Sequence, residues 1–399
     1  MSINATLFIM SIFLGVGLVS IRLFRDVMNP LFILVVPLVL QYWLYYLFIS
    51  DTYRLTSKTN LLMLTAIFSF IIGFYWIMFL PRIRCSRDIP IENVKKHFES
   101  VIPIFLILGV IGFLWGGLLA LKHGLSGPGN FFFNLRYANT IEGESMGLSG
   151  YLLLFLHVIF LAILCFRNMG KSKKKTIILL LLLLLSSAAF TMARTSLLMY
   201  LGSALGTYIV SQKYLYNKKF NLRFIFLACI GFVSIAWLFA LGTGKTTQSG
   251  TNFLFSYIAY PIVAFDQWIL NFPYTTNGSQ TFAVFYKIFD ALGIHEVITL
   301  DVGVPRGQFN TFTFMSAPYL DFKEVGVIFI FIFLGILYGT IYKNVRAGKP
   351  YWIIFYSIML YPLIMSFFEY QYNLSSLIYY AIILWCVFVF GRIRDRKRA

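Results

Sequence analysis

Residues 177–185 read IILLLLLLL, and the lysine-rich stretch KSKKK (171–175) stands just before them. Together with the residues up to 193, these aliphatic side chains form a run of about the length that crosses a lipid bilayer, which takes about 20 apolar residues. Lysines clustered beside such a run are typical of the cytoplasmic edge of a membrane helix. The same alternation of apolar run and short charged connection continues in both directions along the chain.

The composition fits a membrane protein. Hydrophobic residues make up 59% of the 399 residues and charged residues only 12%. A soluble domain of this length cannot bury that much apolar surface against itself, whereas a bilayer can. We therefore expect an all-α, polytopic membrane helix bundle that forms a single integral membrane domain over residues 1–399. About eleven spans are predicted, at 5–21, 30–50, 60–80, 101–121, 148–166, 176–193, 195–212, 222–241, 325–342, 350–368 and 374–391.

The basic residues set the orientation. Alternate connections between the predicted spans hold 24 of the 33 Lys and Arg residues. Positively charged connections stay in the cytoplasm. The N-terminus is therefore predicted outside and the C-terminus in the cytoplasm. Two outside segments are long, 122–147 and 242–324. Within the second, 251–272 is too apolar for a solvated loop, so we expect interfacial helices there.

Several function classes are disfavoured by the sequence. The net charge of +18 resides in short connections beside apolar runs, and no nucleic-acid-binding motif is present, so no nucleic-acid partner is expected. No paired-histidine or CxxC spacing indicates a metal site. The segment GTGKTT (242–247) resembles a P-loop, but Phe239 stands where the motif requires glycine. No cofactor is expected, and Lys245 remains a candidate anion contact.

Basic groups predicted outside are candidates for binding phosphate. Arg136 lies in the loop FFFNLRYANTIEGES (131–145), whose other reading is an ordinary exposed polar loop. Arg194 stands at a tight turn between two apolar spans, where it either fixes the topology or binds a lipid-linked phosphate, since guanidinium groups match phosphate oxygens in a bidentate way. Arg306 begins the polar stretch 304–326, which is the most distinctive of the chain.

Carboxylates and one histidine on the same side are candidates for accepting a proton. They are Glu142, Asp266, Asp321, Glu369 and His295, and the sequence does not choose among them. Asp321 also has the position of a helix N-cap. Tyr137, Tyr257 and Trp268 are candidates for stacking on sugar rings, and Tyr319 is a further candidate binding residue, although anchoring at the membrane interface is the other role of such side chains.

The chain resembles the Wzy O-antigen polymerases, which polymerise the oligosaccharide repeat units of bacterial surface polysaccharides. The resemblance rests on LRYAN (135–139), ARTS (193–196), YPIVAFD (260–266) and above all FNTFTFMSAPYLDF (309–322). The family commonly has Asn-x-x-Thr-Phe and then Tyr-x-Asp-Phe-Gly. Here Asn310 to Phe314 reads N-T-F-T-F, and Lys323 follows Asp321-Phe322 in place of the glycine, so we expect the local turn to differ.

The resemblance implies a glycosyltransferase of the GT-C type in the bacterial inner membrane, with undecaprenyl-pyrophosphate-linked glycans as substrates and a chain-length regulator protein as a partner. Its site would lie on the periplasmic face. Arg136, Arg194, Arg306 and Lys245 would then stabilise the leaving diphosphate, and an acidic residue or His295 would deprotonate the acceptor hydroxyl. Two alternatives stay open, an O-antigen ligase and a flippase or transporter of lipid-linked glycans.

Overall fold

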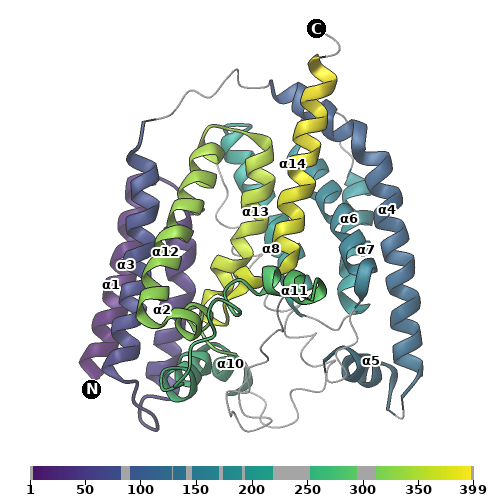
Figure 1. Cartoon of the computed structure of the whole chain (residues 1–399). Coiled ribbons are helices and arrows are strands. Elements are labelled where there is room, and N and C mark those ends of the chain that lie inside the picture. The colour runs from purple at the N-terminus through teal and green to yellow at the C-terminus, as the bar shows by residue number, and fades with distance from the viewer. Residues whose placement is uncertain are drawn as a thin grey trace. The chain divides into compact units, whose positions relative to one another are not determined.

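A computed structural model of the chain describes residues 3–81, 90–127, 129–140, 146–169, 174–190, 194–218, 252–293 and 311–396. All regular secondary structure within these ranges is helical (Figure 1). The principal helices are α1 (Ile3–Phe24), α2 (Pro30–Phe48), α3 (Ser57–Phe79), α4 (Ile91–Leu125), α5 (Phe131–Thr140), α6 (Gly147–Cys165), α7 (Lys174–Phe190), α8 (Arg194–Tyr214), α10 (Asn252–Ala264), α11 (Ala283–Ala291), α12 (Ser316–Arg346), α13 (Pro350–Ile364) and α14 (Ser375–Arg396).

Seven of the predicted spans are confirmed by length and composition. Helices α1, α2, α3, α4, α6, α12 and the segment 350–367, which begins with α13, are each long and apolar enough to cross a membrane. Helices α7, α8 and α14 match three more predicted ranges, with 17, 21 and 22 residues, but are not among the seven. The predicted span 222–241 lies outside the described residues. The chain is thus a multi-pass helical membrane protein.

We expected one membrane domain, and the chain divides into two compact units. Unit 1 comprises residues 1–83, 249–343 and 362–375, and unit 2 comprises residues 84–248, 344–361 and 376–399. Each unit is built from segments that are distant in the sequence. In unit 1, α3 and α12 approach each other closely because Gly73 and Gly335 face the partner helix, where a Cβ atom at either position would collide with backbone of that helix. In unit 2, Gly109 and Gly112 of α4 pack in the same way against α6.

Within unit 1, the connections that are predicted on the same side of the membrane lie together at one end of the unit. At one end, the Tyr342 hydroxyl donates to Asp26 at 2.6 Å, and Lys343 donates to the carbonyl oxygens of Ile77 and Leu80. These residues belong to connections predicted in the cytoplasm or directly adjoin them. At the other end, the connections predicted outside contact each other, as described below. The contacts therefore agree with the alternation of the spans within this unit.

Residues 257–270 of the long segment 242–324 pack into unit 1. Residues Ala259, Ile262 and Phe265 are fully buried, so the apolar character of 257–270 reflects packing within the protein. Helix α11 instead exposes large apolar side chains, among them Phe285 and Ile288, each 51% accessible. Of α10 and α11, it is α11 that has the exposed apolar face expected of an interfacial helix.

Candidate functional site

Asp266 lies at one end of unit 1, where it joins two segments that are far apart in the sequence. The carboxylate accepts hydrogen bonds from the Tyr53 hydroxyl at 2.6 Å, from the Thr56 hydroxyl at 2.5 Å and from the Thr59 hydroxyl. The Thr56 amide adds a weaker contact at 3.3 Å to both oxygens. Asp266 is 1% exposed. The buried carboxylate is thus surrounded by donors from the α2–α3 connection.

The local backbone explains how Asp266 reaches this position. Pro261 lies inside α10 and has no amide hydrogen to donate, and the helix widens into a π-turn at Phe265–Ile269 directly afterwards. Asp266 is the second residue of that turn. On the opposite side, Thr56 is the N-cap of α3 and its side chain accepts from the Thr59 amide. The Thr56 hydroxyl that caps α3 also donates to Asp266.

Asp321 is the second buried carboxylate of this end. It accepts hydrogen bonds from the Thr281 amide at 2.6 Å, from the Gln280 amide at 3.2 Å and from the Thr276 hydroxyl. Asp321 is 1% exposed. We considered that Asp321 caps its own helix, whereas its oxygens bind the turn that precedes α11. The carboxylate fixes the segment 276–281 to α12.

Directly after Asp321, α12 is interrupted. Lys323 has φ 53° and ψ −142°, a combination that glycine adopts readily and that strains other residues. Lys323 thus has backbone angles that favour glycine. Its ammonium group donates to the carbonyl oxygens of Phe272 at 2.6 Å and Tyr274 at 3.0 Å. It also lies 5.2 Å from the ring centre of Tyr319.

A second ammonium group faces the same tyrosine. Lys58 lies 5.5 Å from the ring centre of Tyr319 and forms an ion pair with Glu324 at 2.7 Å. The Tyr319 hydroxyl donates to the Leu270 carbonyl at 3.1 Å. The Lys58 and Glu324 side chains are each about half exposed, at 51% and 50%. Two cations therefore lie over one buried ring, and one of them is accessible from solvent.

Glu369 occupies the connection between α13 and α14, which consists of two short 3₁₀ turns, Met365–Phe367 and Gln371–Asn373. Its carboxylate accepts a hydrogen bond from the Gln371 amide group at 3.3 Å. Burial raises the pKa of Glu369 to about 6, and this hydrogen bond opposes the rise. The next residue, Tyr370, is 4% exposed, and its pKa is raised by burial, by Tyr372 and by the charge of Asp321.

The same connection is anchored on three sides. The Gln41 side-chain amide donates to the Phe367 carbonyl at 2.7 Å and to the Ile258 carbonyl at 3.0 Å. The Phe314 amide donates to the Ser366 carbonyl at 3.1 Å. These bonds tie the α13–α14 connection to α2, to α10 and to the start of α12. The backbone that carries Glu369 is thus held in place.

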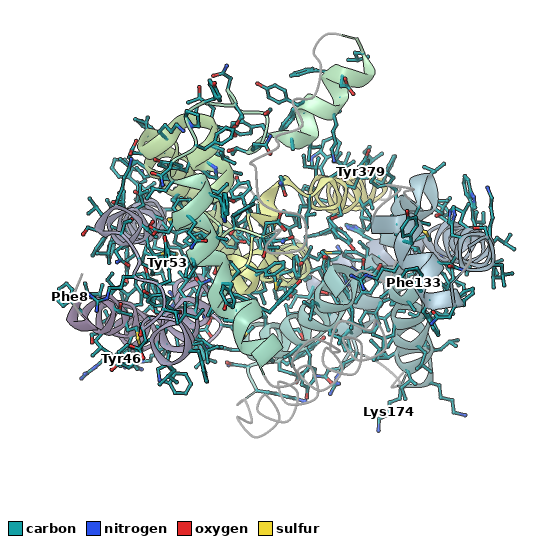
Figure 2. All side chains as sticks on the ribbon, turned by 90° about the horizontal axis from the view of Figure 1, so that it is seen from below. Phe8, Tyr46, Tyr53, Phe133, Lys174 and Tyr379 are labelled. Carbon is teal, nitrogen blue, oxygen red and sulfur yellow. The ribbon has the colours of Figure 1, made fainter. Side chains whose placement is uncertain are left out.

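Four segments, which belong to or adjoin three connections predicted outside, meet at this end of unit 1, which we call the Asp266 end. They are residues 49–59, 265–282, 311–324 and 365–374, and the bonds described above join them. Figure 2 views the structure from this side and labels Tyr53 on the first of them. Of the residues named from the sequence, the structure brings together Asp266, Tyr319, Asp321 and Glu369.

The other predicted site residues lie elsewhere. Tyr137 is on α5 of unit 2, where it is 42% exposed and its ring stacks on Phe133, which Figure 2 labels. Arg136 is on the same helix and is half-buried. Arg194 is the first residue of α8, and its side chain is outside the described residues. Glu142, Lys245, His295 and Arg306 also lie outside them.

No sequence pattern singled out Tyr53, Thr56, Lys58 or Gln41 as site residues. Thr56 followed by an apolar run is a recognisable helix start, but nothing in its neighbourhood indicates a partner more than 200 residues away. No group of three or more His, Cys, Asp and Glu residues suited to a metal ion occurs among the described residues. The chemistry available at the Asp266 end is therefore that of carboxylates, two ammonium groups and tyrosines.

Comparison of the chain with protein-family models, with curated proteins and with solved structures finds no match.

Proposed function

We propose that the chain is a membrane glycosyltransferase that polymerises oligosaccharide repeat units carried on undecaprenyl pyrophosphate, on the periplasmic face of the bacterial inner membrane. The observation that carries the proposal is the interruption of α12. In the resembling polymerases the pattern Tyr-x-Asp-Phe ends in glycine, and here Lys323 takes backbone angles that glycine favours. The backbone angles at position 323 are thus those that the glycine of the family pattern would favour, although the residue here is lysine.

The groups at the Asp266 end suit this chemistry. The donor already carries a diphosphate leaving group, so the protein needs cations to stabilise the departing charge and a base for the acceptor hydroxyl. Lys58 and Lys323 supply cations on one ring, and the Glu324 carboxylate pairs with Lys58. Arg136, Arg194, Arg306 and Lys245 remain the phosphate contacts proposed from the sequence.

Deletion and complementation in the source bacterium test the proposal, with surface polysaccharide separated on a gel. A polymerase predicts that deletion removes the ladder while a single repeat unit still reaches its final acceptor, and that the cloned gene restores the ladder. Loss of all attachment indicates a ligase instead. Accumulation of repeat units on the cytoplasmic leaflet indicates a flippase. An unchanged ladder in the deletion strain overturns all three assignments.

Two substitutions test the phosphate contacts predicted from the sequence. Arg194→Ala and Arg306→Ala are expected to abolish the ladder with protein levels unchanged, because each removes a guanidinium group from a diphosphate. Normal ladders from both variants would remove these two arginines from the proposed site.

A further inference from the structure

We infer that Glu369 is the base that takes the proton from the acceptor hydroxyl. The inference rests on the proposed function and names a residue that the sequence alone did not separate from four others. It follows from a comparison of four carboxylates that the structure describes at the Asp266 end, those of Asp266, Asp321, Glu324 and Glu369.

The carboxylates of Asp266 and Asp321 are not accessible to an acceptor hydroxyl, since each residue is 1% exposed. Asp266 accepts hydrogen bonds from three hydroxyls of its own unit, and Asp321 accepts hydrogen bonds from two amides and a hydroxyl. These donors occupy most of the lone pairs of each carboxylate. Both residues bind segments of the unit together.

Glu324 is also a poor base. Its carboxylate is paired with Lys58 at 2.7 Å and is half exposed to solvent. An opposite charge at this distance favours the ionised form, and an acid that readily stays ionised has little affinity for a proton. The exposed position also leaves water in competition with any acceptor hydroxyl.

Glu369 differs from Glu324 both in its bonding partner and in its exposure to solvent. It is partly buried, and the hydrogen bond from Gln371 to its carboxylate is long, 3.3 Å. Its neighbours in the sequence are aromatic, with Phe368 stacked on Tyr257 at 4.6 Å between ring centres and Tyr370 close to Tyr372. The raised pKa, about 6, is that of a carboxylate able to work near neutral pH.

The position of Glu369 is fixed, as a base requires. Gln41, Phe314 and the stacked pair Tyr257–Phe368 hold the connection between α13 and α14. The bond from the Phe314 amide to the Ser366 carbonyl ties this connection to the segment that leads into α12. A donor whose diphosphate lay at the two ammonium groups would thus be bound at the same end of unit 1 as Glu369.

The step balances without a cofactor. The acceptor hydroxyl oxygen forms a bond to the anomeric carbon of the donor while its proton passes to the Glu369 carboxylate. The bond between the anomeric carbon and the phosphate oxygen breaks, and its electron pair leaves with the diphosphate. Glu369 then returns the proton to solvent.

The test uses membranes that contain the full-length chain and lipid-linked repeat units extracted from the deletion strain. Polymer formation is measured from pH 5 to pH 9 for the wild type and for Glu369→Gln, with protein amounts from immunoblots. Loss of a general base typically costs a factor of about 10²–10⁴, so Glu369→Gln is expected to fall at least about 100-fold at pH 7.5. Asp290→Asn makes the same chemical change at an exposed acid of α11 and is expected to keep the wild-type rate.

Two further readouts separate a base from a merely structural residue. Glu369→Asp keeps a carboxylate and is expected to retain part of the activity with a displaced acid limb. The wild-type rate is expected to fall below about pH 6, the pKa of Glu369. A Glu369→Gln rate within about threefold of wild type, or a wild-type rate unchanged down to pH 5, overturns the inference. The pH dependence of the wild-type rate can be measured even where the Glu369→Gln variant does not accumulate. Wild-type membranes that form no polymer at any pH instead count against the proposed function.

Discussion

The ammonium group of Lys323 lies 2.6 Å from the carbonyl oxygen of Phe272, and the backbone of Lys323 is in a conformation that favours glycine. The side chain and the backbone of this residue thus act in opposite directions on stability. The ammonium group holds the segment after the π-turn against α12, while the positive φ strains the chain at the interruption of that helix.

Substitutions at Lys323 separate these two effects. Lys323→Ala loses the bonds to Phe272 and Tyr274 and keeps the strain, whereas Lys323→Gly loses the same bonds and relieves the strain. A residue forced into this region costs about 1–3 kcal/mol, so the Gly variant is expected to be the more stable by that amount. Thermal unfolding in detergent, with the two variants side by side, measures the difference. An Ala variant as stable as the Gly variant would show that position 323 is not strained.

Removal of the hydroxyl donors to Asp266 is expected to destabilise unit 1. In Thr59→Val one short bond to a buried carboxylate is lost, and bonds to charged groups contribute about 1.5–3 kcal/mol. Thr65→Val is the matched control, since Thr65 lies on the same helix and donates only locally, to the Leu61 carbonyl. Unfolding in detergent should show a large loss for the first variant and a small one for the second. Equal losses would mean that the bond to Asp266 adds little.

The difference between these two threonines could not be predicted from the sequence. Apolar runs fix α1, α2, α3, α4, α6 and α12 almost by length alone, because the bilayer requires about 20 apolar residues whatever the partner helices are. Alternating basic connections predict which loops share an end. The pairing of Thr59 with Asp266 depends instead on a π-turn and on contacts more than 200 residues apart, for which a single sequence carries no local signal. Helix α8 shows a limit of the prediction from apolar runs. A span was predicted at 195–212, but α8 is not among the helices that are long and apolar enough to cross a membrane.

The stability of the chain is expected to depend on the protonation of Glu369. Its pKa is raised from 4.5 to about 6 in the folded protein, so folding favours the protonated form. This contribution is complete below pH 4.5 and is lost as the pH rises through 6. A shift of this size corresponds to about 2 kcal/mol for a fully buried group, and partial exposure reduces it to about 1 kcal/mol.

Measurement of the apparent melting temperature at pH 4.5 and pH 7.5 checks this expectation. The wild type should lose stability relative to Glu369→Gln between the two pH values, because the glutamine does not titrate. A difference between wild type and variant that stays constant with pH would show that Glu369 titrates in the folded protein as it does in the unfolded chain.

His157 is the corresponding polar centre of unit 2. It is fully buried on α6, with Nδ1 2.6 Å from the Tyr380 hydroxyl and Nε2 2.8 Å from the Ser203 hydroxyl. These bonds connect α6 to α14 and α8 in a part of the chain where lipid offers no replacement partners. His157→Leu leaves the Tyr380 hydroxyl buried without that bond, at a cost of about 1–3 kcal/mol. Tyr380→Phe in the His157→Leu background removes the unpaired hydroxyl, so the double variant is expected to recover part of this loss. A double-mutant cycle in detergent unfolding measures the coupling. Strictly additive effects of the two substitutions would mean that the hydrogen bond between His157 and Tyr380 does not stabilise the unit.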